Sequence, residues 1–452
     1  MDNYTTTTNG AVTNKTSGKE CLDLFQRIGN MRYSDRMTIL ENFKQAFKED
    51  KNLATQVLFW ARAARIGAGE RKTFHTILSE IGKTSPEFIT DNAKTLAELG
   101  YWKDLIQYLN IPGVVSTFAQ AIRDKDRLAC KWAPRKCSEL RDELGWTNKQ
   151  YRKWLRVHSE TTEQQMSEKK WSDISYSSVP GTALRRYRGA FDKRDGKRFD
   201  QWKNDKTKTA SVSASYPHEV LACGDEQLMQ KQWDSLPNLL EDSTERILPM
   251  IDVSGSMFGM PLTIAIGLGM YLAERNIGDF KDLFLTFSET PELLRLKGDT
   301  VLERMQNINE SDWGMNTDFT KAYQHILDTA VDNDVDPDSM PTMLLVLSDM
   351  QFDDSQRGGH FQTHFSHMEE EYEKAGYKFP KIVFWNLDAH MGTPAECSDD
   401  SVAMVSGFSP SIMKAVLNAE EFNPLSIMME ALKDIDIDYS NLPERFSYVL
   451  EN

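Results

Sequence analysis

Residues 247–256 read Ile-Leu-Pro-Met-Ile-Asp-Val-Ser-Gly-Ser, an apolar run that ends in alternating polar residues. A run of this length and character is typical of a strand buried on both faces of a parallel sheet. Asp252, Ser254 and Ser256 follow it, with one residue between each pair. One carboxylate and two hydroxyls at the carboxyl end of such a strand form an all-oxygen set suited to Mg²⁺. The pattern predicts an α/β sheet with a divalent-cation site at one edge.

Two later segments offer ligands that this first loop lacks. Thr317 lies in a loop just before an amphipathic helix predicted to begin at Phe319. Asp349 follows the apolar run at residues 342–347, which has the character of a second buried strand. Because the carboxyl ends of parallel strands meet at one edge of a sheet, these side chains are predicted to gather around one Mg²⁺ or Mn²⁺ ion. The five candidate ligands are Asp252, Ser254, Ser256, Thr317 and Asp349.

An alternative is that Asp252 and the serines only cap the helix expected at residues 261–274. That interpretation leaves the other two loops unexplained. The loops also argue against catalysis, since none contains a histidine base and residues 255–257 lack the Gly-x-Ser-x-Gly spacing of a nucleophile elbow. A Mg²⁺ ion with few protein ligands keeps positions open for an external carboxylate or phosphate. We therefore expect a docking site and not an enzyme.

The three loops resemble the von Willebrand factor A domain and its metal-ion-dependent adhesion site. The resemblance covers residues 247–452. It implies a doubly wound, Rossmann-like sheet whose serines and threonine bind the ion directly, while its two aspartates act directly or through water. The chain departs from the family at Asp349-Met350, where the family often has Asp-Gly. Further strands are expected at residues 281–287, 381–387 and 402–405, the last at an edge, and covering helices at residues 409–417 and 424–435.

The net charge of −15 is divided unevenly along the chain. Residues 1–216 contain 38 Lys and Arg against 26 Asp and Glu, whereas residues 217–452 contain 15 against 42. Residues 121–208 alone hold 23 basic and 13 acidic side chains, interleaved with tryptophan and tyrosine. Cations neutralise phosphates and aromatic rings stack on bases, so this composition favours single-stranded RNA as a partner.

The densest basic cluster begins near residue 185 and supplies the candidate phosphate contacts. The candidates are Arg185, Arg186, Arg188, Lys193, Lys197, Lys206 and Lys208. The alternative interpretation is that these cations lie on solvated helix faces and that the nearby aromatic residues belong to a core. Composition alone does not decide between the two.

Apolar residues recur at three- and four-residue intervals through the first part of the chain. This period predicts helices at residues 22–28, 35–47, 53–66, 71–81, 85–99 and 103–109. Short connections make such helices antiparallel neighbours, an arrangement typical of an α-solenoid.

The helical part followed by the adhesion-site loop resembles the Ro ribonucleoprotein family, whose HEAT-like module is shared with telomerase and vault proteins. The matching stretches are residues 145–149 and 179–185. Residues 67–71, 131–134 and 215–218 resemble still more an uncharacterised family of the same layout in plants, bacteria and large viruses. The Ro resemblance implies binding of single-stranded or small structured RNA.

The sequence therefore predicts an α + α/β protein in four parts. These are a disordered tail at residues 1–18, a basic HEAT-like helical domain at 19–215, a connector at 216–246 and a von Willebrand factor A-like domain at 247–452. Five scattered cysteines, the lack of a leader and the lack of an apolar run of about 18 residues lead us to expect a cytoplasmic protein with no membrane association.

The predicted function is a non-enzymatic RNA-binding or ribonucleoprotein component with a divalent-cation docking domain. The main alternative is a protein-interaction scaffold, such as a chaperone or viral assembly component, whose ion captures the carboxylate of an acidic protein ligand. A third and weaker alternative is a hydrolase whose base is lost or hidden.

Overall fold

The computed structural model describes residues 4–6, 12–14, 16–29, 31–212, 215–253, 255–286, 291–309, 319–349, 361–387, 402–407, 409 and 412–448. The chain divides into two compact units, each built from two separate stretches. One unit contains Met1–Ser34 and Ser215–Ala431, and we call it the α/β unit. The other contains Asp35–Ala214 and Leu432–Asn452, and we call it the helical unit. The predicted combination of a helical part and an α/β part is confirmed.

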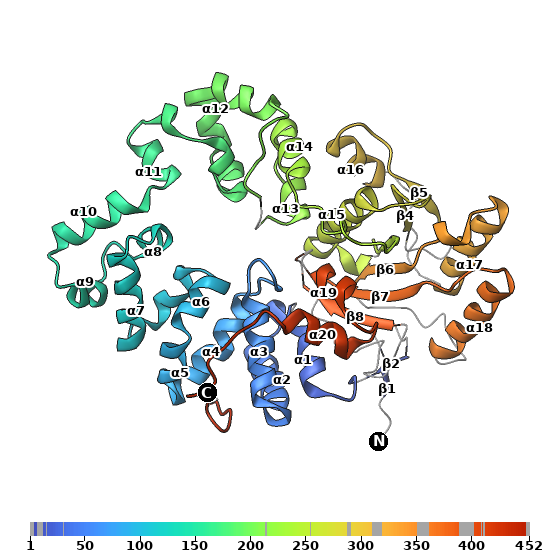
Figure 1. Cartoon of the computed structure of the whole chain (residues 1–452), viewed down its shortest axis with the longest axis horizontal. Helices are drawn as coiled ribbons and strands as arrows, with labels where there is room; N and C mark the ends of the chain where they lie inside the picture. The colour runs from blue at the N-terminus through green and yellow to red at the C-terminus, as the bar shows by residue number, and fades with distance from the viewer. Residues whose placement is uncertain are drawn as a thin grey trace. The chain divides into compact units, whose positions relative to one another are not determined.

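The α/β unit is built on a six-stranded sheet (Figure 1). The strands are β3 (Ile247–Ile251), β4 (Leu283–Thr286), β5 (Leu293–Arg295), β6 (Met343–Ser348), β7 (Lys381–Asn386) and β8 (Val402–Ser406). Their order is β5-β4-β3-β6-β7-β8, and all neighbours are parallel except β4 and β5. This is a doubly wound order, which reverses between β3 and β6. The predicted strands are confirmed, with β8 at an edge, whereas the short and partly exposed β5 escaped prediction.

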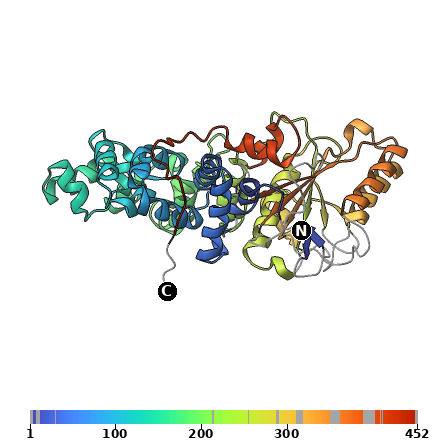
Figure 2. The ribbon, with the colours of Figure 1, turned by 90° about the horizontal axis from the view of Figure 1, so that it is seen from below.

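Helices cover both faces of this sheet. Helices α17 (Phe319–Asp332) and α18 (Phe361–Lys374) pack on one face, where their apolar side chains join those of β3, β6, β7 and β8 in one core. Figure 2 shows this pair in orange beside the strands. Helix α15 (Met260–Arg275) packs on β3, β4 and β6, and a Cβ at Gly269 would touch Ile251 and Leu347. These two residues alternate with the core residues Met250 and Val346, so α15 lies on the opposite face.

Other helices complete the α/β unit. They are α1 (Glu20–Ile28), α13 (Pro217–Leu221), α14 (Glu226–Asp234), α16 (Val301–Asn309), α19 (Ile412–Asn418) and α20 (Pro424–Leu432). Helices α13 and α14 lie where the sequence predicted a connector, and they pack on each other and against α15 and α16. Trp233 of α14 is buried and donates a hydrogen bond to Glu274 of α15 at 2.5 Å. The segment is therefore an ordered layer of the α/β unit.

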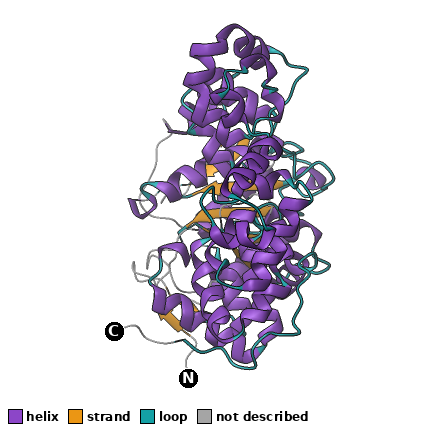
Figure 3. Ribbon diagram, turned by 90° about the vertical axis from the view of Figure 1, so that its left-hand side faces the viewer, coloured by secondary structure: helices purple, strands orange, loops and turns teal. Residues whose placement is uncertain are grey.

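The start of the chain also belongs to the α/β unit. Helix α1, expected in the helical domain, packs on β8. A Cβ on Gly29 would lie 2.7 Å from the carbonyl oxygen of Ser406, so only glycine allows this approach. Before α1, where a disordered tail was predicted, β1 (Tyr4–Thr6) and β2 (Val12–Asn14) form an antiparallel pair. Threonine and valine favour strands, a preference that the polar composition concealed. Figure 3 colours these strands orange, and every strand of the described residues lies in this unit.

The helical unit consists mostly of helices of 6–14 residues, followed by the 24-residue α12. They are α2 (Arg36–Glu49), α3 (Lys51–Arg62), α4 (Lys72–Thr84), α5 (Pro86–Asp91), α6 (Ala93–Leu99), α7 (Pro112–Arg123), α8 (Arg127–Trp132), α9 (Ser138–Leu144), α10 (Asn148–Ser159), α11 (Thr162–Ser167) and α12 (Gly181–Asn204). Helices close in sequence pack together, as expected of a solenoid, and the HEAT-like assignment stays a prediction. Within the described ranges, every helix is too short or too polar to cross a lipid bilayer.

Three predicted helix boundaries differ in the structure. The helix expected at residues 53–66 ends at Arg62, because the chain folds back until a Cβ on Gly67 would lie 1.9 Å from the carbonyl oxygen of Trp60. The helix expected at 85–99 is divided at Asn92 into α5 and α6. The segment expected at 103–109 forms a 3-10 helix, η2 (Trp102–Tyr108).

The end of the chain, predicted as part of the A-domain, belongs to the helical unit. The Phe446 ring lies 4.8 Å from the ring of Phe43. The buried Asn92 amide donates to the carbonyl oxygen of Asp438 at 2.8 Å and accepts from its backbone nitrogen at 2.9 Å. Gln56 donates to two further carbonyl oxygens of the segment. The partners in each contact lie far apart in the sequence, so no local pattern predicts these contacts.

Candidate metal centre and nucleic-acid interface

Two buried aspartates lie at the point where the strand order reverses. Asp252 follows β3 and Asp349 follows β6, and Ile251 pairs in register with Leu347. The Asp252 backbone nitrogen donates to the carbonyl oxygen of Leu347 at 3.0 Å. The exposed fractions of the two aspartates are 2% and 0%. In doubly wound sheets the crevice at this point, outside the carboxyl ends of the strands, is where ligands bind.

The surroundings of these carboxylates suit a cation. Buried carboxylates on neighbouring strands are costly unless hydrogen bonds or positive charge compensate them. Ser348 Oγ donates to Asp252 Oδ2 at 2.5 Å, which compensates part of one charge and orients that carboxylate. Neighbouring strands lie about 4.8 Å apart, a separation that one hard cation can bridge through oxygen ligands.

The remaining predicted ligands are only partly described. Ser256 is exposed in the 3-10 turn η5 (Gly255–Met257) just after β3. Ser254 and Thr317 lie outside the described residues. No group of three or more His, Cys, Asp or Glu within the described ranges is arranged to hold a metal ion. The predicted set contains only two such residues, Asp252 and Asp349, because its other three members are hydroxyls. The absence of a larger group therefore does not test it, and the five-ligand site stays a prediction.

The helix-capping alternative finds no support at α15. The N-cap residue of that helix is Gly259, and no side chain caps it. Polar residues instead line the edge of the sheet beyond the two aspartates. Thr286, Asn386 and Ser406 are buried at the carboxyl ends of β4, β7 and β8. None of these three was predicted as a site residue; each is the last residue of its strand.

The predicted RNA contacts lie along α12 and the turn after it. Five of them are exposed, whereas Arg185 and Arg188 are half-buried. The exposed five are Arg186, Lys193, Lys197, Lys206 and Lys208. Lys208 forms an ion pair with Asp205 at 3.6 Å. Helix α12 is kinked at Asp195, and Lys206 and Lys208 lie beyond its end at Asn204, so the candidates are spread over three short segments and do not form one cluster.

Several aromatic residues near these cations belong to the core. Tyr151, Tyr176 and Trp202 are 1%, 3% and 5% exposed, so of the two interpretations left open by the sequence the core one applies to these rings. Trp202 stacks on Phe199 with ring centroids 5.9 Å apart. The Tyr176 hydroxyl donates at 2.7 Å to Asp195, where α12 is kinked. For these three the core interpretation holds.

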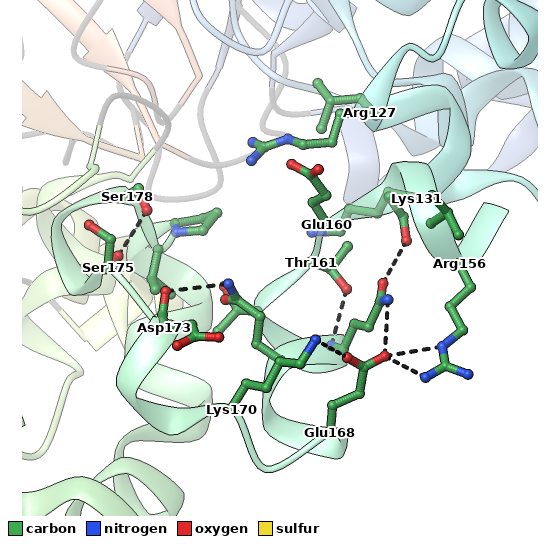
Figure 4. A pocket seen from close by; sticks show the side chains of 18 of the residues that line it. Arg127, Lys131, Arg156, Glu160, Thr161, Glu168, Lys170, Asp173, Ser175 and Ser178 are labelled. Carbon is green, nitrogen blue, oxygen red and sulfur yellow. Dashed lines mark hydrogen bonds and ion pairs between the residues drawn. The ribbon is translucent and has the colours of Figure 1, made fainter. Parts of the chain in front are cut away.

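A cavity of about 750 Å³ opens between α8, α10, α11 and the chain after α11 (Figure 4). We call it the basic pocket. Five cations line it, namely Arg127, Lys131, Lys153, Arg156 and Lys170. The first four stand at four- and three-residue spacing on α8 and α10, which pack together, so each pair shares one helix face. The spacing is visible in the sequence, but other cations share it, such as Lys149 with Lys153 and Lys193 with Lys197, so the pocket could not be found from spacing alone.

Glu168 ties two of these cations to the pocket wall. It accepts hydrogen bonds from Arg156 at 2.6 Å and from Lys170 at 2.9 Å, as Figure 4 shows. Together with Gln164, these partners hold the pKa of Glu168 at about 2. Arg127, Lys131 and Lys153 form no ion pair with any described residue, although the Lys131 ammonium lies 5.4 Å from the Trp132 ring centre. These three cations are therefore available to bind an external anion.

A second cavity, of about 520 Å³, adjoins the basic pocket and shares Asp173 and Ser175 with it. Lys208 lines it, the one member of the predicted RNA set to line either cavity. Arg198 is also there, but it donates to Asp195 and to the carbonyl oxygens of Trp171 and Ile174. These hydrogen bonds hold the kink of α12 in place, so the Arg198 guanidinium has a structural role.

Comparison with known proteins places the chain in a family. A family model described as a domain of unknown function (DUF2828) matches residues 7–127 and 113–245, more than half of the chain, and the protein belongs to this family. A second model, also a domain of unknown function (DUF7788), matches residues 247–441. Neither description names a von Willebrand factor A domain, so that resemblance stays a prediction.

An uncharacterized protein of Acanthamoeba polyphaga mimivirus is 29% identical over 506 aligned residues, covering 96% of this chain and 88% of that protein. These matches fit the predicted resemblance to an uncharacterised family of this layout. Among solved structures, the Ro (RSR) protein of Deinococcus radiodurans is 14% identical with a TM-score of 0.37, over 95% of this chain and 96% of that one.

Proposed function

We propose that this protein is a non-enzymatic RNA-binding component whose α/β unit docks a ligand through a divalent cation. The observation that carries the docking half is the placement of Asp252 and Asp349. Both are buried, and they follow adjacent parallel strands where the strand order reverses. That placement is typical of a ligand site in a doubly wound sheet.

The predicted oxygens would hold Mg²⁺ or Mn²⁺. They are Asp252, Ser254, Ser256, Thr317 and Asp349, two carboxylates and three hydroxyls. Mg²⁺ demands octahedral oxygen coordination and sheds its waters reluctantly, so a site of this kind leaves a position for an external carboxylate or phosphate. The protein's part is to fix the carboxylates, as Ser348 does for Asp252, and to exclude water from one side of the ion.

The RNA-binding half rests on charge. The cations of residues 121–208 outnumber the acids, and the described structure exposes most of the candidate set on α12. The second half of the chain, with 15 basic against 42 acidic residues, repels a polyanion. RNA therefore binds the helical unit, and the α/β unit contributes through its ion alone.

Calorimetry with Mn²⁺ and Mg²⁺ on the full chain tests the docking site. Asp252→Ala is expected to weaken divalent binding at least tenfold, because it removes a charged ligand. Asp279→Ala, at an exposed position of the same unit, serves as the matched control and should bind like the wild type. Equal affinity in the wild type and in an Asp252→Ala, Ser254→Ala double variant would overturn the proposal.

A second candidate function, a protein-docking scaffold, is favoured by one observation. Phe258 is 88% exposed and Met260 is 51% exposed, both just after the candidate ligand Ser256. A protein that offers a carboxylate to the ion could place an apolar side chain on this pair. Gel retardation of labelled RNA at low salt separates the two functions. Failure of the full chain to retard RNA, combined with divalent-dependent binding of an acidic peptide, selects the scaffold.

A further inference from the structure

The basic pocket combines features that a nucleotide chain requires. Its volume of about 750 Å³ lies within the range of roughly 300–1,000 Å³ that small-molecule sites occupy. Its cations come from two packed helices and from the chain after α11, so they surround a hollow. Arg127 and Lys153 are exposed, and Lys131 is half-buried. These three are the cations that no described acid neutralises.

Apolar surface lies within the same pocket. Leu128 follows Arg127 on α8 and is 39% exposed, and Val157 follows Arg156 on α10 and is 53% exposed. Both line the cavity. Ligand sites combine apolar surface with a few convergent polar groups, and these two side chains supply that surface. A flat base resting on them would cover apolar area while its phosphate reached the neighbouring cations.

The acids of the pocket select among anions. Glu160 and Asp173 are exposed and line the cavity, so a uniformly charged polyanion would meet repulsion there. A nucleotide chain carries hydrogen-bond donors between its phosphates, and carboxylates accept from ribose 2′-hydroxyls and from base amino groups. Thr161, Gln165 and Ser178 supply further neutral polar groups along the wall. The mixture of cations, acids and apolar surface favours RNA over a simple polyphosphate.

We infer that the basic pocket holds a nucleotide of single-stranded RNA, with phosphates at Arg127, Lys131 and Lys153 and a base against Leu128 and Val157. This inference rests on the proposed RNA-binding function and locates it at a site different from the predicted cations on and after α12. Glu168 acts as an internal competitor, because it occupies Arg156 and Lys170 when RNA is absent. Bound phosphate and the Glu168 carboxylate compete for the same two cations.

Fluorescence anisotropy of a labelled single-stranded RNA of about ten nucleotides, with the full chain at low salt, tests the site. Arg127→Glu with Lys153→Glu is expected to weaken binding at least tenfold. Both positions are exposed, and the variants should unfold at the wild-type temperature. In the neutral variant, Arg127→Ala with Lys153→Ala, the slope of log affinity against log salt should fall by about 1.4, since each lost contact removes about 0.7 for single strands.

Glu168→Gln is expected to strengthen binding several-fold, because it releases Arg156 and Lys170. A gain of affinity cannot come from misfolding, so this variant distinguishes an effect on the site from an effect on the fold. Leu128→Ala with Val157→Ala should weaken binding without changing the salt slope, since it removes apolar contact and no charge. AMP should bind far more weakly than the RNA, and tighter binding of AMP would overturn RNA as the ligand.

Arg186→Glu with Lys193→Glu on α12 is the charge-matched comparison. If that variant loses RNA while Arg127→Glu with Lys153→Glu binds like the wild type, the pocket inference is overturned and the proposed function stands. If the wild-type chain binds no RNA at all, both are overturned. Loss in the pocket variant together with a gain in Glu168→Gln supports the inference, whatever α12 contributes.

Discussion

The α/β unit and the helical unit differ in where they keep their buried polar groups. In the α/β unit the strands are apolar along their length, and a row of buried polar residues, including Asp252 and Asp349, lies where the strands end. In the helical unit, buried charges lie among the helices and are paired, as Arg62 and Asp104 are at 3% and 2% exposure. The buried Arg62 and Asp104 therefore have a structural role, as does the buried Asp23 of the α/β unit, which pairs with Arg27. Asp252 and Asp349 instead lie at a crevice that suits a ligand.

Asp104 is the centre of one such network. Its carboxylate accepts from Arg62 at 2.5 Å, from Arg71 at 3.0 Å and from the Tyr101 backbone nitrogen at 2.9 Å, and His75 lies at 3.1 Å. These partners come from α3, from the start of α4 and from the turn before η2. The network thus links three segments through buried polar contacts, in addition to their apolar packing.

The largest expected effect is that of Asp104→Asn. Removing one member of a buried ion pair leaves the other charge uncompensated, and such changes cost about 3–5 kcal/mol. We expect the free energy of unfolding of the helical unit to fall by about 3 kcal/mol, measured by urea denaturation followed by circular dichroism. The α/β unit should keep its hydrogen-exchange protection.

Asp142→Asn is the matched control, since Asp142 also pairs with an arginine but its side chain is 66% exposed. Exposed pairs contribute about 0–1 kcal/mol, so this variant should resemble the wild type. If both variants lose the same free energy of unfolding, the buried charge of Asp104 contributes no more to stability than an exposed one, and its structural role is contradicted.

A second prediction concerns the segment at the end of the chain. Phe446 is 7% exposed and packs against Phe43 and Phe47, with ring centroids 4.8 and 6.0 Å apart. Phe446→Ala is expected to cost about 2–3 kcal/mol, below the usual 3–5 kcal/mol for a fully buried phenylalanine. Hydrogen exchange should rise in α2 and α3 and stay unchanged in β3 and β6.

Phe258→Ala supplies the comparison in the α/β unit, because that ring is 88% exposed and should add nothing to stability. If hydrogen exchange in the Phe446→Ala variant becomes faster in the sheet and not in α2 and α3, the segment at the end of the chain stabilises the α/β unit and not the helical unit.

The sequence predicted elements better than it predicted their grouping. Apolar runs identified β3, β6 and β7, because a strand buried on both faces has a strong local signal. The same signal placed Asp252 and Asp349 at one edge. It could not assign α1 or residues 432–452 to their units, because long-range packing leaves no local period. Nor could composition show that Tyr176 and Trp202 are core residues while Arg127 and Lys153 share a cavity.

The smallest expected effect is a pH dependence confined to the helical unit. Burial disfavours the charged form of Asp104, but the hydrogen bond from His75 and the charge of Arg62 outweigh burial and lower the pKa of Asp104 from 3.8 to about 2. A lowered pKa in the folded state stabilises the protein above the unfolded value and loses that effect as pH falls through the folded value. The contribution is therefore complete above about pH 5 and declines toward pH 2, by roughly 2 kcal/mol. Asp104→Asn cannot titrate at this position, so the stability difference between wild type and variant should shrink by that amount over the same interval. If the difference in unfolding free energy between wild type and Asp104→Asn stays constant from pH 5 to pH 2, the charge of Asp104 does not stabilise the helical unit. The buried charges of that unit would then not differ from those of the α/β unit in having a structural role.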